Sequence, residues 1–256
     1  MTNGIHAEPG RSTSLDSENH SPSGDDESET ALPSQPSRCA RKAPASLAER
    51  LLTVPAFVRT NNAAHLYVCY SRKNRGRVHM EEKRRFQLFV RLECDPNVRR
   101  LNMAVTEASS VDAELPAAVS LDRNHRLTVH RFAGGKDGEE ARVAWESWCK
   151  RHGFVHLEWR SADLLDNPVL LESRARLLRF VTRAGSPPDE VLKEIMLCEL
   201  RRVRRATFTD MLRLGEGRPI DEVQATVADL LLTAEVESDI GSKPLSMATL
   251  MEVHHA

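Results

Sequence analysis

The sequence lacks the patterns that mark several classes of protein. None of its five cysteines, Cys39, Cys69, Cys94, Cys149 and Cys198, belongs to a CxxC pair, so we expect reduced thiols and no structural zinc site. No apolar run approaches the roughly 18–20 residues that cross a bilayer. The N-terminus has no basic region followed by an apolar stretch, as a secretory signal would have. These absences predict a cytoplasmic protein with no membrane partner.

A glycine-rich phosphate-binding loop and a GxSxG nucleophile motif are also missing. The glycines of "AGGKDGEE" (133–140) do not have the spacing of a phosphate loop and predict a turn. His152 and His156 are four residues apart, but Gly153 separates a predicted helix from a predicted strand there, so we do not expect them to share a metal ion. These patterns imply no cofactor.

Charge is unevenly distributed along the chain. Of the 256 residues, 29% are charged and 40% hydrophobic, and the net charge is −1. Residues 1–45 contain seven acidic and four basic side chains, whereas residues 71–100 contain ten basic and four acidic ones. The near-neutral total therefore hides a segment of net charge +6 that could meet the phosphates of a nucleic acid.

Composition divides the chain into three parts. Residues 1–45 are rich in Ser, Pro, Asp, Glu and Gly and cannot bury enough apolar surface to offset their ordering entropy, so we predict a disordered tail. Residues 46–183 alternate predicted helices and strands around the antiparallel hairpin "LPAAVSLDRNHRLTVHRF" (115–132). Residues 188–256 follow the boundary "AGSPPD" (184–189) with short helices typical of a small winged-helix-like domain. The predicted fold class is α/β with a helical C-terminal domain.

Two predicted helices are important for the later argument. In the stretch from 79 to 94, apolar residues at i, i+3 and i+4 give one buried face to a helix that ends before Pro96. In the C-terminal part, Val191, Ile195 and Leu200 form a stripe that we expect to face that domain's own core. The opposite, exposed face of the domain is then the better candidate for a protein partner.

From about residue 65 to 250 the chain resembles the TnsA family, the endonuclease subunits of heteromeric cut-and-paste transposons. "HMEEKRRFQLFVRLECDPNV" (79–98) is similar to the family's opening helix, "LPAAVSLDRNHRLTVHRF" (115–132) to its TPD…(E/Q)xK hairpin, and "RHGFVHLEWRSADLLDNPVLL" (151–171) to its later strand and acidic turn. The resemblance implies a restriction-endonuclease-like mixed sheet with flanking helices and a winged-helix-like C-terminal domain. It also implies three partners, namely DNA, a DDE transposase and an AAA+ ATPase.

Most catalytic positions that the resemblance implies are replaced here. Nucleases of this type hold a divalent metal on carboxylates and use a lysine to stabilise the developing charge. Glu81 matches the family's helix glutamate, but the metal-binding aspartate falls on Ala117, the second acid or amide on His130 and the lysine on Phe132. Alanine cannot bind a metal and phenylalanine cannot replace a lysine, so the resemblance implies a catalytically impaired core.

A displaced metal site is the alternative. Asp112 and Glu114 lie two residues apart, could point to one face of a strand, and could hold Mg²⁺ together with Glu81. Asp122 lies nearby but in the predicted turn, where its carboxylate would be solvated. On this alternative the protein is an active metal-dependent endonuclease that cuts DNA at transposon ends.

The basic segment is the predicted contact with DNA. Its side chains would bind phosphates without reading sequence, and as parts of a loop and a helix start they should contribute little to stability. The alternative is a solvated surface paired with neighbouring acids. The residues assigned to DNA binding are Arg72, Lys73, Arg75, Arg77, Lys83, Arg84 and Arg85, and Arg99 and Arg100 extend the cluster.

Three functions remain open from the sequence. The favoured one is a non-cutting, TnsA-like subunit that binds DNA and assembles a transposition complex. The second is the active endonuclease with a displaced site and Mg²⁺ as its cofactor. The third is a winged-helix DNA-binding regulator with an unrelated α/β domain.

Overall fold

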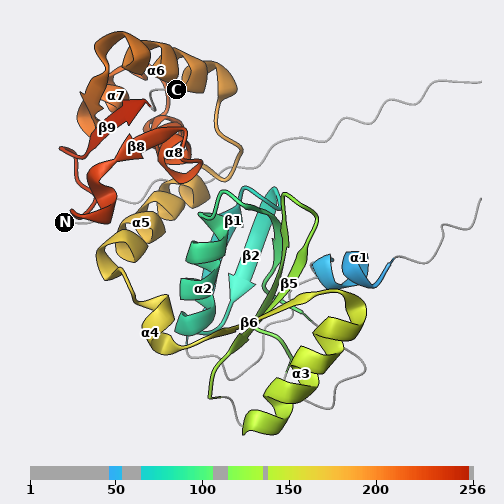
Figure 1. The fold of residues 1–256 in the computed structure, drawn as a ribbon. Coiled ribbons are helices and arrows are strands. Elements are labelled where there is room, and N and C mark those ends of the chain that lie inside the picture. The colour runs from blue at the N-terminus through green and yellow to red at the C-terminus, as the bar shows by residue number, and fades with distance from the viewer. Residues whose placement is uncertain (1–45, 54–64, 106–114, 135–137, 254–256) are drawn as a thin grey trace, which may run out of the picture. The chain divides into compact units, whose positions relative to one another are not determined.

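The computed structural model describes residues 46–53, 65–105, 115–134 and 138–253, which belong to one compact unit, Pro44–Ala256. These residues form a mixed α/β structure with three separate sheets (Figure 1). No helix in these four ranges is long and apolar enough to cross a membrane. The predicted tail and the alternative metal ligands Asp112 and Glu114 lie outside the described residues.

A short helix and a hairpin open the described chain. α1 (Leu47–Leu52) has a capping box in which Ser46 Oγ accepts from the Glu49 N–H at 3.2 Å, while the Glu49 carboxylate accepts from the Ser46 N–H at 2.9 Å. β1 (Tyr67–Ser71) pairs antiparallel with β2 (Gly76–Met80) and forms a separate two-stranded sheet. The β-branched and aromatic residues of "HLYVCYS" (65–71) predict a strand there, and β1 confirms it.

α2 (Lys83–Glu93) begins later than the sequence pattern suggested. His79 and Met80 belong to β2, where they pair with Val68 and Tyr67, so the backbone there is extended. Of the predicted apolar face, Phe89, Val90 and Cys94 are buried and Phe86 is half-buried, and Leu88 and Leu92 are buried as well.

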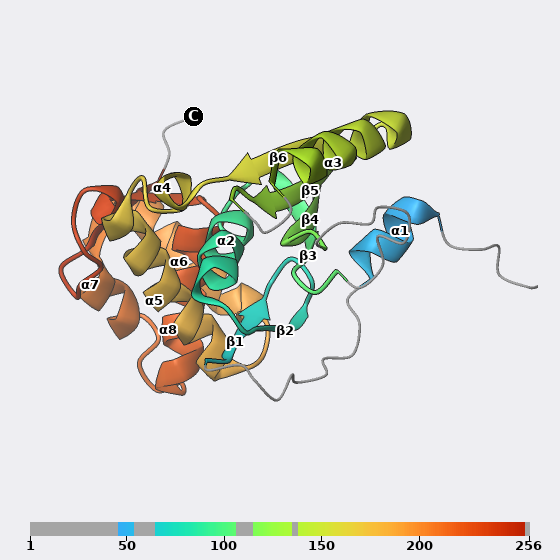
Figure 2. The same cartoon turned by 90° about the horizontal axis from the view of Figure 1, so that it is seen from below.

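A four-stranded mixed sheet follows α2. Its strand order is β3-β4-β5-β6, in which only the β5–β6 pair is parallel. α3 covers one face, where Trp145 and Trp148 pack with Val119 and Val129, and α2 lies on the other side (Figures 1 and 2). The elements are β3 (Val98–Asn102), β4 (Ala118–Asp122), β5 (Leu127–Phe132), α3 (Gly138–His152) and β6 (Val155–Trp159).

The rest of the chain is helical with a small sheet. The strand order there is β7-β9-β8, antiparallel throughout. The elements are α4 (Ser161–Leu164), α5 (Pro168–Ala184), α6 (Glu190–Val203), β7 (Arg205–Thr207), α7 (Phe208–Arg213), α8 (Ile220–Leu232), β8 (Val236–Ser238), the 3-10 helix η1 (Asp239–Gly241) and β9 (Leu250–Val253).

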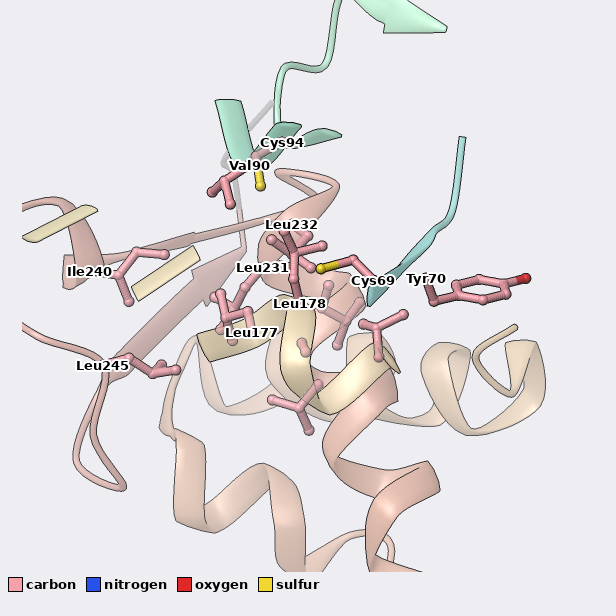
Figure 3. Packing of buried hydrophobic residues seen from close by; sticks show 14 of the residues in the cluster. Cys69, Tyr70, Val90, Cys94, Leu177, Leu178, Leu231, Leu232, Ile240 and Leu245 are labelled. Atoms are coloured by element: carbon pink, nitrogen blue, oxygen red, sulfur yellow. The ribbon is translucent and has the colours of Figure 1, made fainter. Parts of the chain in front are cut away.

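α5 joins the sheet region to the C-terminal elements. Asn167 caps its start by accepting from the Leu170 N–H, and Gly185 ends it in the left-handed region at φ 66°, which explains why "AGSPPD" looks like a boundary. Leu177 and Leu178 of α5 pack in one continuous apolar cluster with residues of α8 and β1 (Figure 3). Helices on the two sides of the expected boundary at 184–188 therefore share a core.

α6 corrects one sequence prediction. Leu200 is buried as expected, but Val191 and Ile195 are 65% and 47% exposed. The core face of α6 consists instead of Leu192, Met196, Leu197 and Leu200. Because the helix carries apolar residues on two faces, spacing alone could not tell which stripe is buried.

Candidate functional site

The antiparallel hairpin predicted within residues 115–132 is confirmed as β4 and β5. The Ala117 N–H donates to the His130 carbonyl at 2.8 Å, and Ala118 is paired with His130. Phe132 lies two residues beyond His130 on the same strand, and therefore on the same face of the sheet. The hairpin thus brings the Ala117 backbone within hydrogen-bonding distance of His130, with Phe132 two residues further along β5.

The start of α2 meets this hairpin through two arginines, which we call the arginine pair (Arg84 and Arg85). The Arg84 guanidinium lies 4.3 Å from the centre of the Phe132 ring. The Arg85 guanidinium donates to the carbonyls of Met103 and Ala117 at 3.1 and 3.2 Å. The arginine pair therefore brings two cations to the Ala117 and Phe132 positions of the hairpin.

Glu81 precedes α2 in the chain. It lies between β2 and the N-cap residue Glu82, whose side chain makes no capping hydrogen bond. Since Arg84 and Arg85 are in the first turn of α2, the backbone of Glu81 is within about one helical turn of the residues that touch the hairpin. Glu81 and the arginine pair therefore lie close together in sequence around the start of α2.

His130 is fully engaged inside the sheet. It is 3% exposed, Trp159 Nε1–H donates to its Nδ1 at 3.0 Å, and its Nε2 lies 2.7 Å from Ser120 Oγ. Because an indole N–H can only donate, the proton of the neutral imidazole is on Nε2 and is donated to Ser120. Burial, with a smaller contribution from His156, lowers the pKa of His130 to about 3. His130 is therefore a neutral, satisfied core residue.

No group of three or more His, Cys, Asp or Glu side chains that could hold a metal ion occurs among residues 46–53, 65–105, 115–134 and 138–253. Asp122 is the last residue of β4, and its carboxylate accepts from the Arg126 N–H at 2.8 Å. The displaced site built from Glu81 with Asp112 or Glu114 includes residues beyond the described ranges.

A hollow of about 500 Å³ lies on the His130 side of the sheet. Ser120, Thr128 and His130 form part of its wall, and Arg91 and Arg174 bring two guanidinium groups to it. Arg91 is already engaged, since it forms an ion pair with Asp166 and donates to the Leu164 carbonyl. The hollow thus combines small hydroxyls with two arginines and two carboxylates, those of Asp95 and Asp122.

The basic loop between β1 and β2 differs from the sequence expectation. The Arg72 side chain is only 13% exposed, and its guanidinium lies 2.8 Å from Asp229 and 3.7 Å from Glu93. The Lys73 ammonium donates to the carbonyls of Asp95 and Val98. The expectation that this loop contributes little to stability is therefore wrong for Arg72.

Arg72 belongs to a buried ion cluster, which consists of Arg72, Glu93, Lys193 and Asp229. Glu93 is 1% exposed and accepts from the Ser71 hydroxyl and the Arg72 N–H, both at 2.8 Å. Lys193 donates to Asp229 at 2.9 Å. Burial raises the pKa of Glu93, while the neighbouring Arg72 charge opposes that rise. The cluster ties α2 and the β1–β2 turn to α6 and α8.

The remaining members of the predicted DNA contact are more accessible. Arg75, Arg77 and Lys83 are exposed, as are Arg99 and Arg100 on β3. A second hollow, of about 510 Å³, has Arg99 in its wall, together with Arg72, Lys73 and Arg123 and the carboxylates Glu93 and Asp95. The structure therefore separates the basic segment into paired and exposed cations.

Sequence reasoning missed the buried ion cluster and the partners of His130. One signal was present, because Glu93 follows Phe86 and Phe89 at helical spacing and so falls on the apolar face of α2. A charged residue at such a position requires a buried partner. Nothing local identified Arg72 or Asp229 as that partner.

Comparison with known proteins adds no assignment to this geometry. The sequence matches no protein-family model, and no curated protein is significantly similar to it.

Proposed function

We propose that the chain is a TnsA-like, DNA-binding and assembly subunit of a DNA transposition complex, with an impaired nuclease core. The proposal rests on one observation: side chains at the start of α2 contact the start of β4 and the end of β5. The resemblance places the nuclease residues on these segments. The mixed sheet between α2 and α3 supports a restriction-endonuclease-like core.

The side chains where these segments meet are the reason that we expect no DNA cleavage by this core. Ala117 offers no ligand, and the nitrogens of His130 are both used within the protein. The arginine pair adds positive charge where a divalent cation would have to bind, and like charges repel at short range. A metal-dependent step at the hairpin is therefore disfavoured by electrostatics as well as by missing ligands.

DNA binding does not need the metal, because lysine and arginine side chains bind phosphates directly. Lys83 and the arginine pair occupy the first turn of α2, where the helix dipole also favours an anion. The exposed Arg75 and Arg77 lie just before this turn in the chain. These five cations are the proposed phosphate contacts.

The C-terminal elements support the assembly part of the proposal. The order α6–β7–α7–α8–β8–β9 with sheet order β7-β9-β8 is consistent with a winged-helix-like unit. Its third helix, α8, is buried from Ala225 to Leu232, and α5 packs on it. A buried helix cannot enter a DNA groove, which argues against the regulator hypothesis. In the proposal this region binds proteins, namely the DDE transposase and the AAA+ ATPase that the resemblance implies.

A salt titration of duplex binding, together with a nuclease assay, tests the proposal. We expect the full chain to bind duplex DNA with an affinity that falls steeply with salt, and to leave the DNA intact with Mg²⁺ or Mn²⁺. The double variant Arg75→Gln/Arg77→Gln should flatten the log–log salt slope by up to about 0.9 per lost phosphate contact. Unlike changes at Arg72, it leaves the buried ion cluster untouched.

The matched control is Lys150→Gln/Arg151→Gln, which removes the same charge from exposed positions at the end of α3. Equal slopes for both double variants would show that Arg75 and Arg77 are merely solvated. No binding at low salt would overturn the proposal. Metal-dependent cutting that Glu81→Ala abolishes would instead support the displaced-site endonuclease, which stays a prediction.

A further inference from the structure

The exposed apolar face of α6 is the starting observation. Val191, Ile195 and Cys198 point away from the core, and with Leu214 they line an open groove of about 770 Å³. The opposite face of the same helix is already buried in the protein. The second apolar face therefore has no role in the fold of the described chain.

The spacing along this face is that of a coiled-coil seam. Val191, Ile195, Cys198 and Arg202 follow one another at intervals of four, three and four residues, as alternate core positions of a heptad do. The flanking positions on one edge are Glu194 and Arg201. These two side chains form an ion pair at 3.2 Å within the helix and are more than half exposed.

We propose that this face is a dimer interface, in which a second copy of the chain packs its own α6 antiparallel across a two-fold axis between Ile195 and Cys198. Ile195 of each copy then faces Cys198 of the other. Val191 faces the aliphatic stem of Arg202, whose guanidinium can stay in solvent beside Glu199. The two central layers are apolar.

The charged residues beside the apolar seam favour the antiparallel arrangement over the parallel one. In the antiparallel register, edge position Glu194 of one helix lies opposite Arg201 of the other, and the two-fold axis makes this favourable pair twice. In a parallel pair, Glu194 would lie opposite Glu199 of the other helix, and like charges would repel. The antiparallel register thus pairs the apolar residues with each other and the acids with bases. A surface that binds a second copy of itself must do both.

The dimer should be weak. α6 has 14 residues and is about 21 Å long, so a single helix pair buries an area at the low end for specific interfaces. We expect a reversible monomer–dimer equilibrium in the micromolar range. The inference does not depend on DNA binding.

Mixing two charge variants gives the sharpest test. Glu194→Arg and Arg201→Glu each turn both interhelical pairs repulsive, so each variant alone should dimerise about tenfold more weakly than the wild type. In an equimolar mixture, both pairs of the heterodimer are attractive again. Sedimentation velocity of the full chain at increasing concentration should show dimer in the mixture and in the wild type, but little in either variant alone.

A matched pair of apolar substitutions tests the seam. Ile195→Asp places two carboxylates at the centre of the interface and should abolish the dimer. Val143→Asp on α3 changes a residue of nearly equal exposure, 49% against 47%, and should leave the dimer intact. Thermal unfolding of both variants confirms that each is folded.

Cross-linking fixes the orientation. In a Cys39→Ser background, oxidation of the Ile195→Cys variant should give a covalent dimer through Cys198 of the other copy, and adding Cys198→Ser should remove it. A covalent dimer that survives Cys198→Ser would indicate parallel helices and overturn the proposed register. A monomer at all concentrations, a dimer that tolerates Ile195→Asp, or no rescue on mixing would overturn the interface itself.

Discussion

The two ends of α2 use charge in opposite ways. At its C-terminal end, Glu93 is buried, and its carboxylate is held by Arg72 and Ser71. At its N-terminal end, the arginine pair reaches backbone carbonyls and an aromatic ring. Glu93 and the arginine pair each stand at the end that the helix dipole disfavours, since the dipole favours acids at the start and bases, such as Arg91, at the end. Only the C-terminal end has its charge balanced by a buried ion pair.

The difference separates charges that hold the fold together from charges that are available to a ligand. A buried ion that loses its partner is costly, so every member of the buried ion cluster is required. Cations at a helix start without a buried partner can still gain an anion from outside. Sites that break a local rule without internal compensation are where function is expected.

The largest expected effect concerns the C-terminal end of α2, where Glu93 belongs to the buried ion cluster. Arg72→Met should lower the free energy of unfolding by about 3–5 kcal/mol, because Glu93 is left buried without its ion-pair partner and Asp229 keeps only Lys193. Urea unfolding at neutral pH measures the change. Arg77→Met, at an exposed position on β2, should change it by no more than about 0.5 kcal/mol. Equal losses for the two variants would show that the cluster is not a structural unit.

The next effect concerns pH and His130, the neutral residue buried in the sheet. His130 has a folded-state pKa of about 3 against an ordinary value of 6.5, so the folded protein binds fewer protons than the unfolded chain between these values. Stability is therefore present above pH 6.5 and lost as the pH falls. By about pH 5 the loss from this group should reach about 2 kcal/mol.

His130→Gln should remove that part of the pH dependence, as measured by urea unfolding at neutral and acidic pH. His156, whose pKa burial also lowers, should leave a residual slope. His125→Gln, in the exposed turn between β4 and β5, should leave the wild-type slope unchanged. A wild-type slope in the His130→Gln protein would mean that the imidazole is already charged in the fold.

The smallest effect concerns Arg84, at the N-terminal end of α2. Arg84→Gln removes the cation over the Phe132 ring and should cost only about 0.5–1 kcal/mol of stability. If Arg84 also binds a phosphate, the same change should flatten the salt dependence of duplex binding by about 0.9. Arg126→Gln, an exposed position in the β4–β5 turn, is the control for both measurements. A large loss of stability with an unchanged salt slope would make Arg84 a structural residue like Arg72.

Much of the fold was predictable because it depends on local patterns. The capping box at Ser46, the β4–β5 hairpin and the helix that ends at Gly153 all have signals within a few residues. These elements were predicted in the right place for physical reasons that the sequence displays.

The remainder depends on contacts between distant residues. β7 and β9 are only three and four residues long and pair across more than forty positions, so no local pattern indicates them. In the buried ion cluster, Glu93 is bound by Arg72, which lies 21 residues before it in the chain. Arg72 is also bound to Asp229, which is 157 residues from Arg72. Spacing indicated one apolar stripe of α6, with Val191 and Ile195, but the tertiary structure covers the other face, with Leu192 and Met196.

The position of α5 has a consequence for how this chain could change in evolution. Its buried residues Leu177, Leu178 and Val181 belong to the same apolar cluster as α8 and β1. A chain cut at 184 would expose the surface that α8 now covers, and a chain begun at 188 would expose the matching surface of α8. Neither half would remain soluble as a free module. Recombination at the apparent linker should therefore be selected against, and the two halves should be inherited as one unit.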